Sequence, residues 1–122
     1  MANRKKQNWK PGTMIYPLPA VLVSCGNRPE QYNLFTVSWV GTSCTNPPMC
    51  YISVRPERHS YSILKENKEF VINLTTENMA RATDWCGIRS GKDYNKFAES
   101  ELTPVPSEKI AAPYIEESPL CI

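Results

Sequence analysis

Three polar segments of the sequence carry side chains that could recognise a phosphorylated ligand. The first is a strand-like run in which Thr36 and Ser38 alternate with apolar residues. The second is SVRPERHS at residues 53–60, which leaves a predicted strand and enters a predicted helix. The third is RSGKD at residues 89–93, a loop with a glycine and two cations. Together these segments offer hydroxyls, cations and the positive end of a helix dipole, all of which suit a phosphate group.

Two interpretations of these segments stay open on the residues alone. Arg55 and Arg58 flank a strand-to-helix junction, where free backbone N–H groups and guanidinium groups could hold a phosphate. Turns and solvated surfaces, however, are rich in the same residue types. The segments therefore predict either a binding site for a phosphorylated ligand or an ordinary polar surface.

Other kinds of site find little support in the sequence. Neither a GxGxxG fingerprint nor a GxxxxGK[ST] loop is present, and we name no catalytic residue. His59 is the single histidine, and we expect it at a helix start on the surface rather than in a catalytic pair. The five cysteines are dispersed without a CxxC pair, so we expect no metal site and most of them buried as small apolar residues. Cys86 is expected to be a buried structural thiol.

Length and charge predict one globular domain that does not bind nucleic acid. The chain has 122 residues and a net charge of +2, with its Lys and Arg residues scattered, which argues against nucleic-acid binding. No apolar run follows the early positive charges and none could span a bilayer, so we expect no membrane segment and a cytoplasmic location. We predict a disordered N-terminal tail at residues 1–11 and one domain at residues 12–122.

The periodicity of apolar residues predicts strands followed by helices. Phe35, Val37 and Trp39 are expected on one face of a strand, with Thr36 and Ser38 on the other. We expect Thr75 or Thr76 to cap the second helix, Gly87 to end it, and an irregular chain after Phe97. Short connections between strands favour an antiparallel sheet or barrel decorated by helices. The expected strands are 20–25, 35–40, 49–55 and 70–75, with the start of another at 119–122, and the expected helices are 57–66 and 77–86.

Two long segments resemble one protein family. FTVSWVGTSCTNPPMCYISVRPERHSYSILKENKEFVINL at 35–74 closely resembles the FMN-binding flavin reductase and flavoredoxin proteins, and DWCGIRSGKDYNKF at 84–97 resembles the second signature of that family. The resemblance runs from about Gly12 to the end, in several ordered blocks at matching spacing. It implies an FMN-binding split β-barrel, mainly β with helices, antiparallel and Greek-key-like.

The resemblance also implies roles for individual residues. Residues 36–39 match the strand along the isoalloxazine ring of FMN, and residues 53–55 continue that pocket. Arg58 and Ser60 match the turn that holds the phosphate, while residues 90–92 match a loop that reaches the phosphate or closes the pocket. The implied cofactor-binding residues are Thr36, Val37, Ser38, Trp39, Ser53, Val54, Arg55, Arg58, Ser60, Ser90, Gly91 and Lys92.

The function implied by the resemblance is electron transfer. We expect an FMN-binding oxidoreductase that passes electrons from NAD(P)H to flavin, working as a homodimer. Two alternatives are a flavoredoxin-type carrier, which exchanges electrons with a protein redox partner, and a truncated, flavin-free structural domain. Relatives continue past Cys121 and Ile122 with strands that complete the barrel, so we expect a barrel that is incomplete at the C-terminus.

Overall fold

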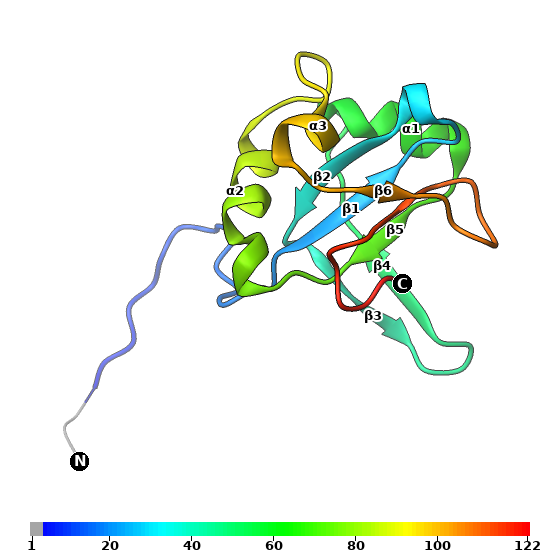
Figure 1. Ribbon diagram of the computed structural model, residues 1–122. Coiled ribbons are helices and arrows are strands. Elements are labelled where there is room, and N and C mark those ends of the chain that lie inside the picture. Colours follow the sequence, from blue (N-terminus) through cyan, green and yellow to red (C-terminus); the bar gives the residue numbers. More distant parts are fainter. Residues whose placement is uncertain (1–3) are drawn as a thin grey trace.

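The centre of the fold is a three-stranded antiparallel sheet in the order β2-β1-β5 (Figure 1). The computed structural model describes residues 4–122. The middle strand, β1 (Val21–Cys25), is buried throughout and apolar except for Ser24, and it pairs with β2 (Asn33–Val37) and β5 (Val71–Asn73). Gly26 ends β1 with φ +107, a conformation that L side chains rarely adopt. A continuous apolar run therefore forms a strand that is covered on both faces.

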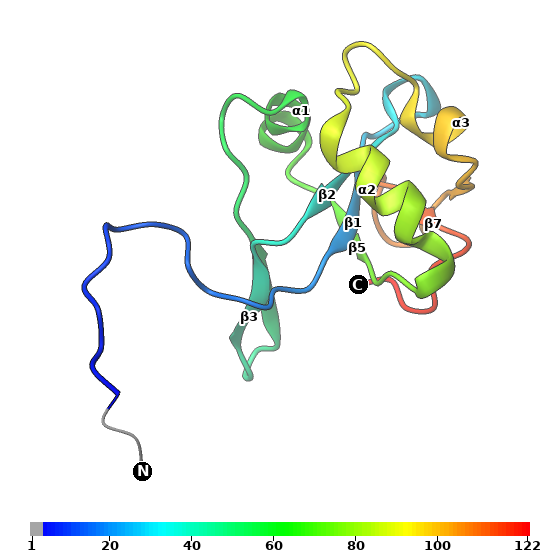
Figure 2. The same ribbon diagram turned by 90° about the vertical axis from the view of Figure 1, so that its left-hand side faces the viewer.

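Helices cover the two faces of this sheet (Figure 2). One face packs against α1 (His59–Asn67), and the other against α2 (Ala80–Ile88) and α3 (Lys96–Ser100). A short 3₁₀ turn, η2 (Glu77–Met79), leads into α2, and another, η1 (Pro29–Gln31), lies between β1 and β2. Alternation along the strands sends side chains into two apolar clusters. The first contains Val21, Val23, Cys25, Phe35, Val37, Ile63 and Ile72, and the second contains Leu22, Leu34, Met79, Cys86, Phe97, Leu102 and Ile115.

A hairpin of β3 (Val40–Cys44) and β4 (Met49–Ile52) projects from the sheet (Figure 1). The prediction of one strand over residues 35–40 was therefore wrong, because the chain bends at Ser38 and Trp39. Pairing with β1 ends at Val37, and the pairing of β3 with β4 begins three residues later. Trp39 is consequently 43% exposed and does not share the buried face of the preceding residues.

Other predicted boundaries need smaller corrections. The helix predicted at 57–66 is α1, and β4 stops three residues before the predicted end because Arg58 N–H donates to the carbonyl of Arg55 in a turn. Gly87 lies inside α2, where a Cβ atom would come within 3.3 Å of the Thr36 side chain. Its role is thus close approach between helix and strand, not helix termination. Thr76 precedes η2 without a capping side-chain hydrogen bond.

The segment after residue 97 is more regular than predicted. It continues α3 and then forms a small hairpin from β6 (Pro104–Val105) and β7 (Tyr114–Ile115). The expected strand start at 119–122 is confirmed by antiparallel contact with β5, because Ile72 and Ile122 exchange two backbone hydrogen bonds of 2.8 Å. Residues 4–122 thus contain three small antiparallel sheets and no closed barrel.

The expectation that most of the cysteines are buried was wrong. Cys25 and Cys86 are buried, but Cys44 and Cys50 lie exposed on the β3–β4 hairpin, and Cys121 is half-buried. Only the base of the hairpin, at Val40 and Ile52, packs against the core, so the side chains farther out lie in solvent, which sequence alternation alone did not reveal.

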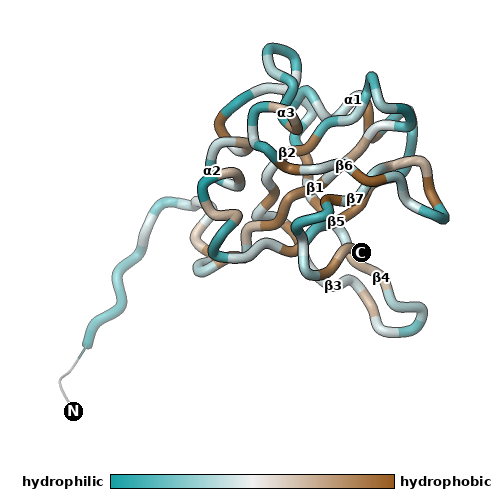
Figure 3. Tube along the Cα trace, in the orientation of Figure 1, coloured by the Kyte–Doolittle hydropathy of each residue, from teal (hydrophilic) through white to brown (hydrophobic). Residues whose placement is uncertain are grey.

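Residues 4–19 run away from the sheet as an exposed segment without helix or strand, and the outer part of this segment is hydrophilic (Figures 1 and 3). Residues 1–3 of the tail that we predicted to be disordered lie outside the described residues. Within residues 4–122 we find no helix with the length and hydropathy needed to cross a membrane.

Candidate functional site

A cavity of about 370 Å³, here called the β2 cavity, opens where β2 ends. The bend after β2 exposes backbone and side chains that would be paired in a longer strand. Because β2 is an edge strand of its sheet, backbone groups on its outer side have no strand partner. The lining residues are Phe35, Thr36, Val37, Ser38, Trp39, Ser53, Val54, Arg55 and Arg58.

Hydrogen bonds fix the two walls of the β2 cavity relative to each other. The backbone N–H of Ser53 donates to the carbonyl of Trp39 at 2.9 Å, which joins the bend after β2 to the segment after β4. The hydroxyl of Thr36 donates to the carbonyl of Thr83 and so ties β2 to α2. The Thr36 side chain therefore has a structural role in addition to its place in the cavity wall.

A second cavity of about 170 Å³, here called the α1 cavity, lies at the start of α1. It shares Phe35, Thr36 and Arg58 with the β2 cavity, so the two form neighbouring parts of one site. The first N–H groups of a helix have no partner within the helix and carry the positive end of its dipole. The remaining lining residues are Glu57, His59, Ser60, Cys86, Gly87, Ile88, Arg89, Ser90, Gly91 and Lys96.

Close packing brings the loop at residues 89–91 against β2 and the start of α1. The buried Asn33 side chain donates to the hydroxyl oxygen of Ser60 at 2.8 Å, which leaves the Ser60 proton available to the cavity. A Cβ atom at Gly91 would lie 2.8 Å from both Asn33 Cγ and the His59 ring. Only glycine fits this contact, so its presence lets the loop border the cavity.

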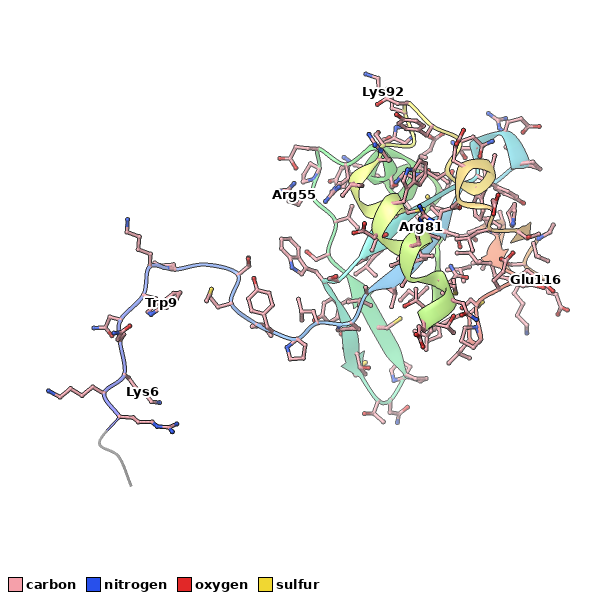
Figure 4. All side chains as sticks on the ribbon, turned by 60° about the vertical axis from the view of Figure 1, so that its left-hand side comes forward. Lys6, Trp9, Arg55, Arg81, Lys92 and Glu116 are labelled. Atoms are coloured by element: carbon pink, nitrogen blue, oxygen red, sulfur yellow. The ribbon has the colours of Figure 1, made fainter. Side chains whose placement is uncertain are left out.

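The structure places all but one of the predicted binding residues around these two cavities. The exception is Lys92, which lines neither cavity and extends outward from the tip of its loop (Figure 4). Its backbone N–H donates to the Ser90 hydroxyl at 3.2 Å, which orders the turn. His59 begins α1 at the surface, as predicted, and it also borders the α1 cavity.

Two further cations line the α1 cavity: Arg89, which the sequence placed in the polar loop at 89–93 but not among the binding residues, and Lys96, which sequence reasoning missed. The Arg89 guanidinium lies 5.7 Å from the centre of the Tyr94 ring, and that ring meets Trp85 edge-on at 5.6 Å. Lys96 is buried, and its ammonium donates to the carbonyl of Cys86 at 2.8 Å. Burial is the largest cause that lowers the pKa of Lys96, and the nearby charge of Arg58 lowers it further. The available signal was the lysine inside the second family-like segment.

A third cavity of about 670 Å³ adjoins the β2 cavity on its other side. It lies between residues 12–18 and the β3–β4 hairpin, and it shares Ser38, Trp39 and Ser53 with the β2 cavity. None of its lining residues carries a formal charge. Among residues 4–122 we find no group of three or more His, Cys, Asp or Glu side chains that could hold a metal ion.

Comparison with known proteins identifies the class of this fold and site. Residues 13–122 match the family model described as the flavin reductase like domain. Flavoredoxin of Desulfovibrio vulgaris (Miyazaki F) superimposes with a TM-score of 0.88 at 35% identity, covering 97% of this chain and 64% of that one. Flavoredoxin from Methanosarcina acetivorans gives a TM-score of 0.88 at 28% identity, covering 98% and 62%. The fold is thus that of the split-barrel flavin proteins.

A curated relative extends the match to sequence. An uncharacterized protein of Pyrococcus abyssi is 30% identical over 105 residues, which are 86% of this chain and 59% of that protein. This chain therefore belongs to the flavin reductase-like family. It spans less than two thirds of the length of the relatives described here.

Proposed function

We propose that this chain binds FMN and acts as an oxidoreductase that passes electrons from NAD(P)H to flavin. The observation that carries the proposal is the pair of adjoining cavities that share Arg58, one along the free edge at the end of β2 and the other at the start of α1, where Arg89 and Lys96 also line it. FMN has the same division, with a planar polar ring at one end and a phosphate at the other. Membership of the flavin reductase-like family supports a redox role for that flavin.

The residues present fit this cofactor. In our proposal the backbone of residues 36–39, together with residues 53–55, holds the ring in the β2 cavity. Arg58, Ser60 and residues 90–91 hold the phosphate in the α1 cavity, and a role for Lys92 in reaching the phosphate or closing the pocket stays a prediction. When bound, FMN supplies the electron-transfer chemistry. N–H groups fixed along the outer edge of β2 would stabilise negative charge on a ligand at that edge.

The third cavity adjoins the place proposed for the flavin ring, and we propose that the electron donor binds there. Its uncharged lining and aromatic residues, Trp39 and Tyr51 among them, suit an uncharged ring such as nicotinamide. Ile15 and Tyr16, which line this cavity, are each more than 70% exposed, as is Trp9 farther out on the same segment (Figure 4), and this supports the homodimer that we also propose. The cytoplasmic location and the domain limits at residues 12–122 stay predictions. Size-exclusion chromatography with light scattering tests the dimer.

A flavoredoxin-type electron carrier is the second candidate. It is favoured by the two flavoredoxin structures, which superimpose over almost the whole of this chain. Purified protein distinguishes the candidates. Steady oxidation of NADH or NADPH with free flavin supports the reductase, whereas slow turnover with rapid reduction by a ferredoxin-like protein supports the carrier. A colourless preparation that fails to bind added FMN would reject both, and would support a flavin-free structural domain.

Arg58→Ala tests the proposed phosphate site directly. Arg58 borders both cavities, so its loss should weaken FMN binding by roughly 10-fold, the lower end of the effect of a charge-assisted hydrogen bond. Riboflavin, which lacks the phosphate, should be affected much less. Arg81→Ala is the matched control, because Arg81 is exposed on α2 and lines neither cavity. Equal weakening of FMN and riboflavin would reject a phosphate role for Arg58.

A further inference from the structure

Residues 4–10, here called the cationic arm, form an exposed segment that lies apart from the sheets and helices (Figure 4). Every charged side chain in the cationic arm is a cation, and all of them are exposed: Arg4, Lys5, Lys6 and Lys10. The first of the 12 Asp and Glu residues of the chain is Glu30. Neighbours along the sequence therefore do not neutralise these cations.

The opposite end of the molecule is acidic. Residues 97–122 contain five carboxylates and one cation, Lys109, which gives this segment a net side-chain charge of −4. The five carboxylates are all exposed and belong to Glu99, Glu101, Glu108, Glu116 and Glu117. Lys6 and Glu116 lie at opposite ends of the molecule in Figure 4, and α3 also lies away from the arm in Figure 2. The chain thus has a net charge of only +2 but a strong separation of charge.

This separation of charge determines how an anionic partner approaches. The summed field of all charges steers a diffusing protein, so that oppositely charged surfaces meet first. The acidic end repels an anionic partner, whereas the cationic arm attracts it. Such a partner therefore meets this molecule at the arm, and the attraction is strongest at low ionic strength because salt screens exposed charges.

The cationic arm leads directly into the candidate site. Residues 12–18 follow the arm and form one wall of the third cavity, which shares Ser38, Trp39 and Ser53 with the β2 cavity. Seven residues of extended chain reach about 25 Å at most, so a protein held by the arm stays close to that cavity. The arm is therefore in the right place for a protein that exchanges electrons with the site.

Two other kinds of polyanion fit these charges less well. A nucleic acid presents a long row of phosphates, but residues 30–122 carry twelve carboxylates against nine cations and would repel it. An anionic membrane also attracts clustered Lys and Arg side chains. Neither partner, however, gives a reason for the arm to continue into the wall of a cavity beside a redox site. A compact acidic protein fits both the charge and the position.

We propose that the cationic arm is the docking element for a small acidic electron-transfer protein, which it holds beside the third cavity. This inference rests on the proposed function for the exchange of electrons, but not for the binding of an acidic protein. Arg4, Lys5 and Lys6 supply the attraction, and they lie farther out along the chain than the apolar residues that support the homodimer.

Isothermal titration with a plant-type ferredoxin, a small acidic iron–sulfur protein, tests the docking. The arm variant, Arg4→Gln/Lys5→Gln/Lys6→Gln, removes three charges outside the sheets and helices, so its Tm should equal that of the wild type. At low ionic strength the arm variant should bind ferredoxin roughly 10-fold more weakly than the wild type, the combined effect of three exposed ion pairs. In about 0.5 M salt the two proteins should bind ferredoxin equally weakly.

The matched control is Lys65→Gln/Arg81→Gln/Lys109→Gln. It has the same net charge as the arm variant, and its three substitutions lie at exposed positions that line neither the β2 cavity nor the α1 cavity. The control should bind ferredoxin within about 2-fold of the wild type, because exposed charges away from the contact contribute little.

The position of the bound protein provides a second readout. The reduced cluster of ferredoxin is paramagnetic, so it broadens the NMR signals of nearby amides. Signals of residues 12–18 should broaden more than those of β6 and β7, which lie on the side away from the arm (Figures 1 and 2).

Any of five results would overturn the proposal. Two concern affinity: equal ferredoxin binding by the arm variant and the wild type, or equal weakening in the arm variant and the control. A third is broadening confined to β6 and β7. A fourth is a change in the oligomeric state of the arm variant, which would show that the arm binds a second copy of this chain. The fifth is tighter arm-dependent binding to single-stranded DNA or to phosphatidylserine vesicles than to ferredoxin.

Failure of this inference and failure of the proposed function give different results. A wild-type protein that binds ferredoxin through the arm but does not bind FMN would reject the flavin function and keep the docking role. A protein that binds FMN but not ferredoxin would reject the docking role and keep the flavin function.

Discussion

Replacing Gly91 with alanine should damage the phosphate side of the site. A Cβ atom there would lie 2.8 Å from Asn33 Cγ and from His59 Cδ2, which is well below the ordinary contact range that begins at 3.4 Å. The nearest contact would be with Asn33 Oδ1, so either the loop at residues 89–91 moves outward by about 1 Å, or the Asn33 side chain turns away from Ser60. In both cases the wall of the α1 cavity is displaced.

The expected magnitude follows from the hydrogen bond at risk. Asn33 and Ser60 are both buried, so breaking their 2.8 Å bond leaves polar groups without partners and costs about 1–3 kcal/mol. For a domain of this size, that corresponds to a Tm lower by roughly 4–15 °C. FMN binding should weaken more than riboflavin binding, because the displaced loop borders only the α1 cavity.

Thermal unfolding followed by circular dichroism, together with titrations of both flavins, measures these effects. Gly12→Ala is the matched control, because its Cβ atom would meet only the flexible Met14 side chain at 3.8 Å. A Gly91→Ala protein with the Tm and the FMN affinity of Gly12→Ala would refute the reasoning about the loop.

Two further predictions concern the cysteines. A thiol reagent such as DTNB should label Cys44 and Cys50 rapidly in the folded protein, because both are exposed on the hairpin, and should label the buried Cys25 only on unfolding. Peptide mapping identifies the labelled cysteines. Rapid labelling of Cys25 would contradict the fold. Burial raises the pKa of Cys25 from its ordinary 9.0 to about 12, so the folded state keeps a proton that the unfolded state releases. The stabilisation is complete below pH 9 and is lost as pH rises toward 12. Urea titrations at several pH values should show that the free energy of unfolding falls with pH, and that it falls less steeply in Cys25→Ala than in the control Cys44→Ala. Equal dependence on pH in the two variants would exclude Cys25 as the cause.

Local sequence signals predicted the elements whose burial is simple. The run AVLVSC contains no charge and becomes the central strand, because a strand covered on both faces is nearly all apolar; the hydroxyl of its one polar residue, Ser24, donates to the carbonyl of Pro113. The junction after β4 was also visible, since Pro56 marks the end of one element and the start of another. The family resemblance then linked residues 36–39, 53–60 and 89–92, which no periodicity places side by side.

Features that depend on distant contacts were not predictable from local patterns. The bend at Ser38 and Trp39 arises because β2 ends its pairing with β1 while β3 pairs with β4, and the alternation of apolar residues continues unchanged across that bend. Gly87 has the sequence context of a helix stop, but its contact with Thr36 belongs to another element. Lys96 looks like a surface lysine until α2 and α3 pack around it.

Titration of the purified 122-residue chain with FMN and with riboflavin tests the central claim most directly. Isothermal titration calorimetry should show saturable binding of FMN with one site per chain, and distinctly weaker binding of riboflavin, because Arg58, Arg89 and Lys96 surround the place proposed for the phosphate. Absence of saturable FMN binding, or equal affinity for the two flavins, would contradict the account.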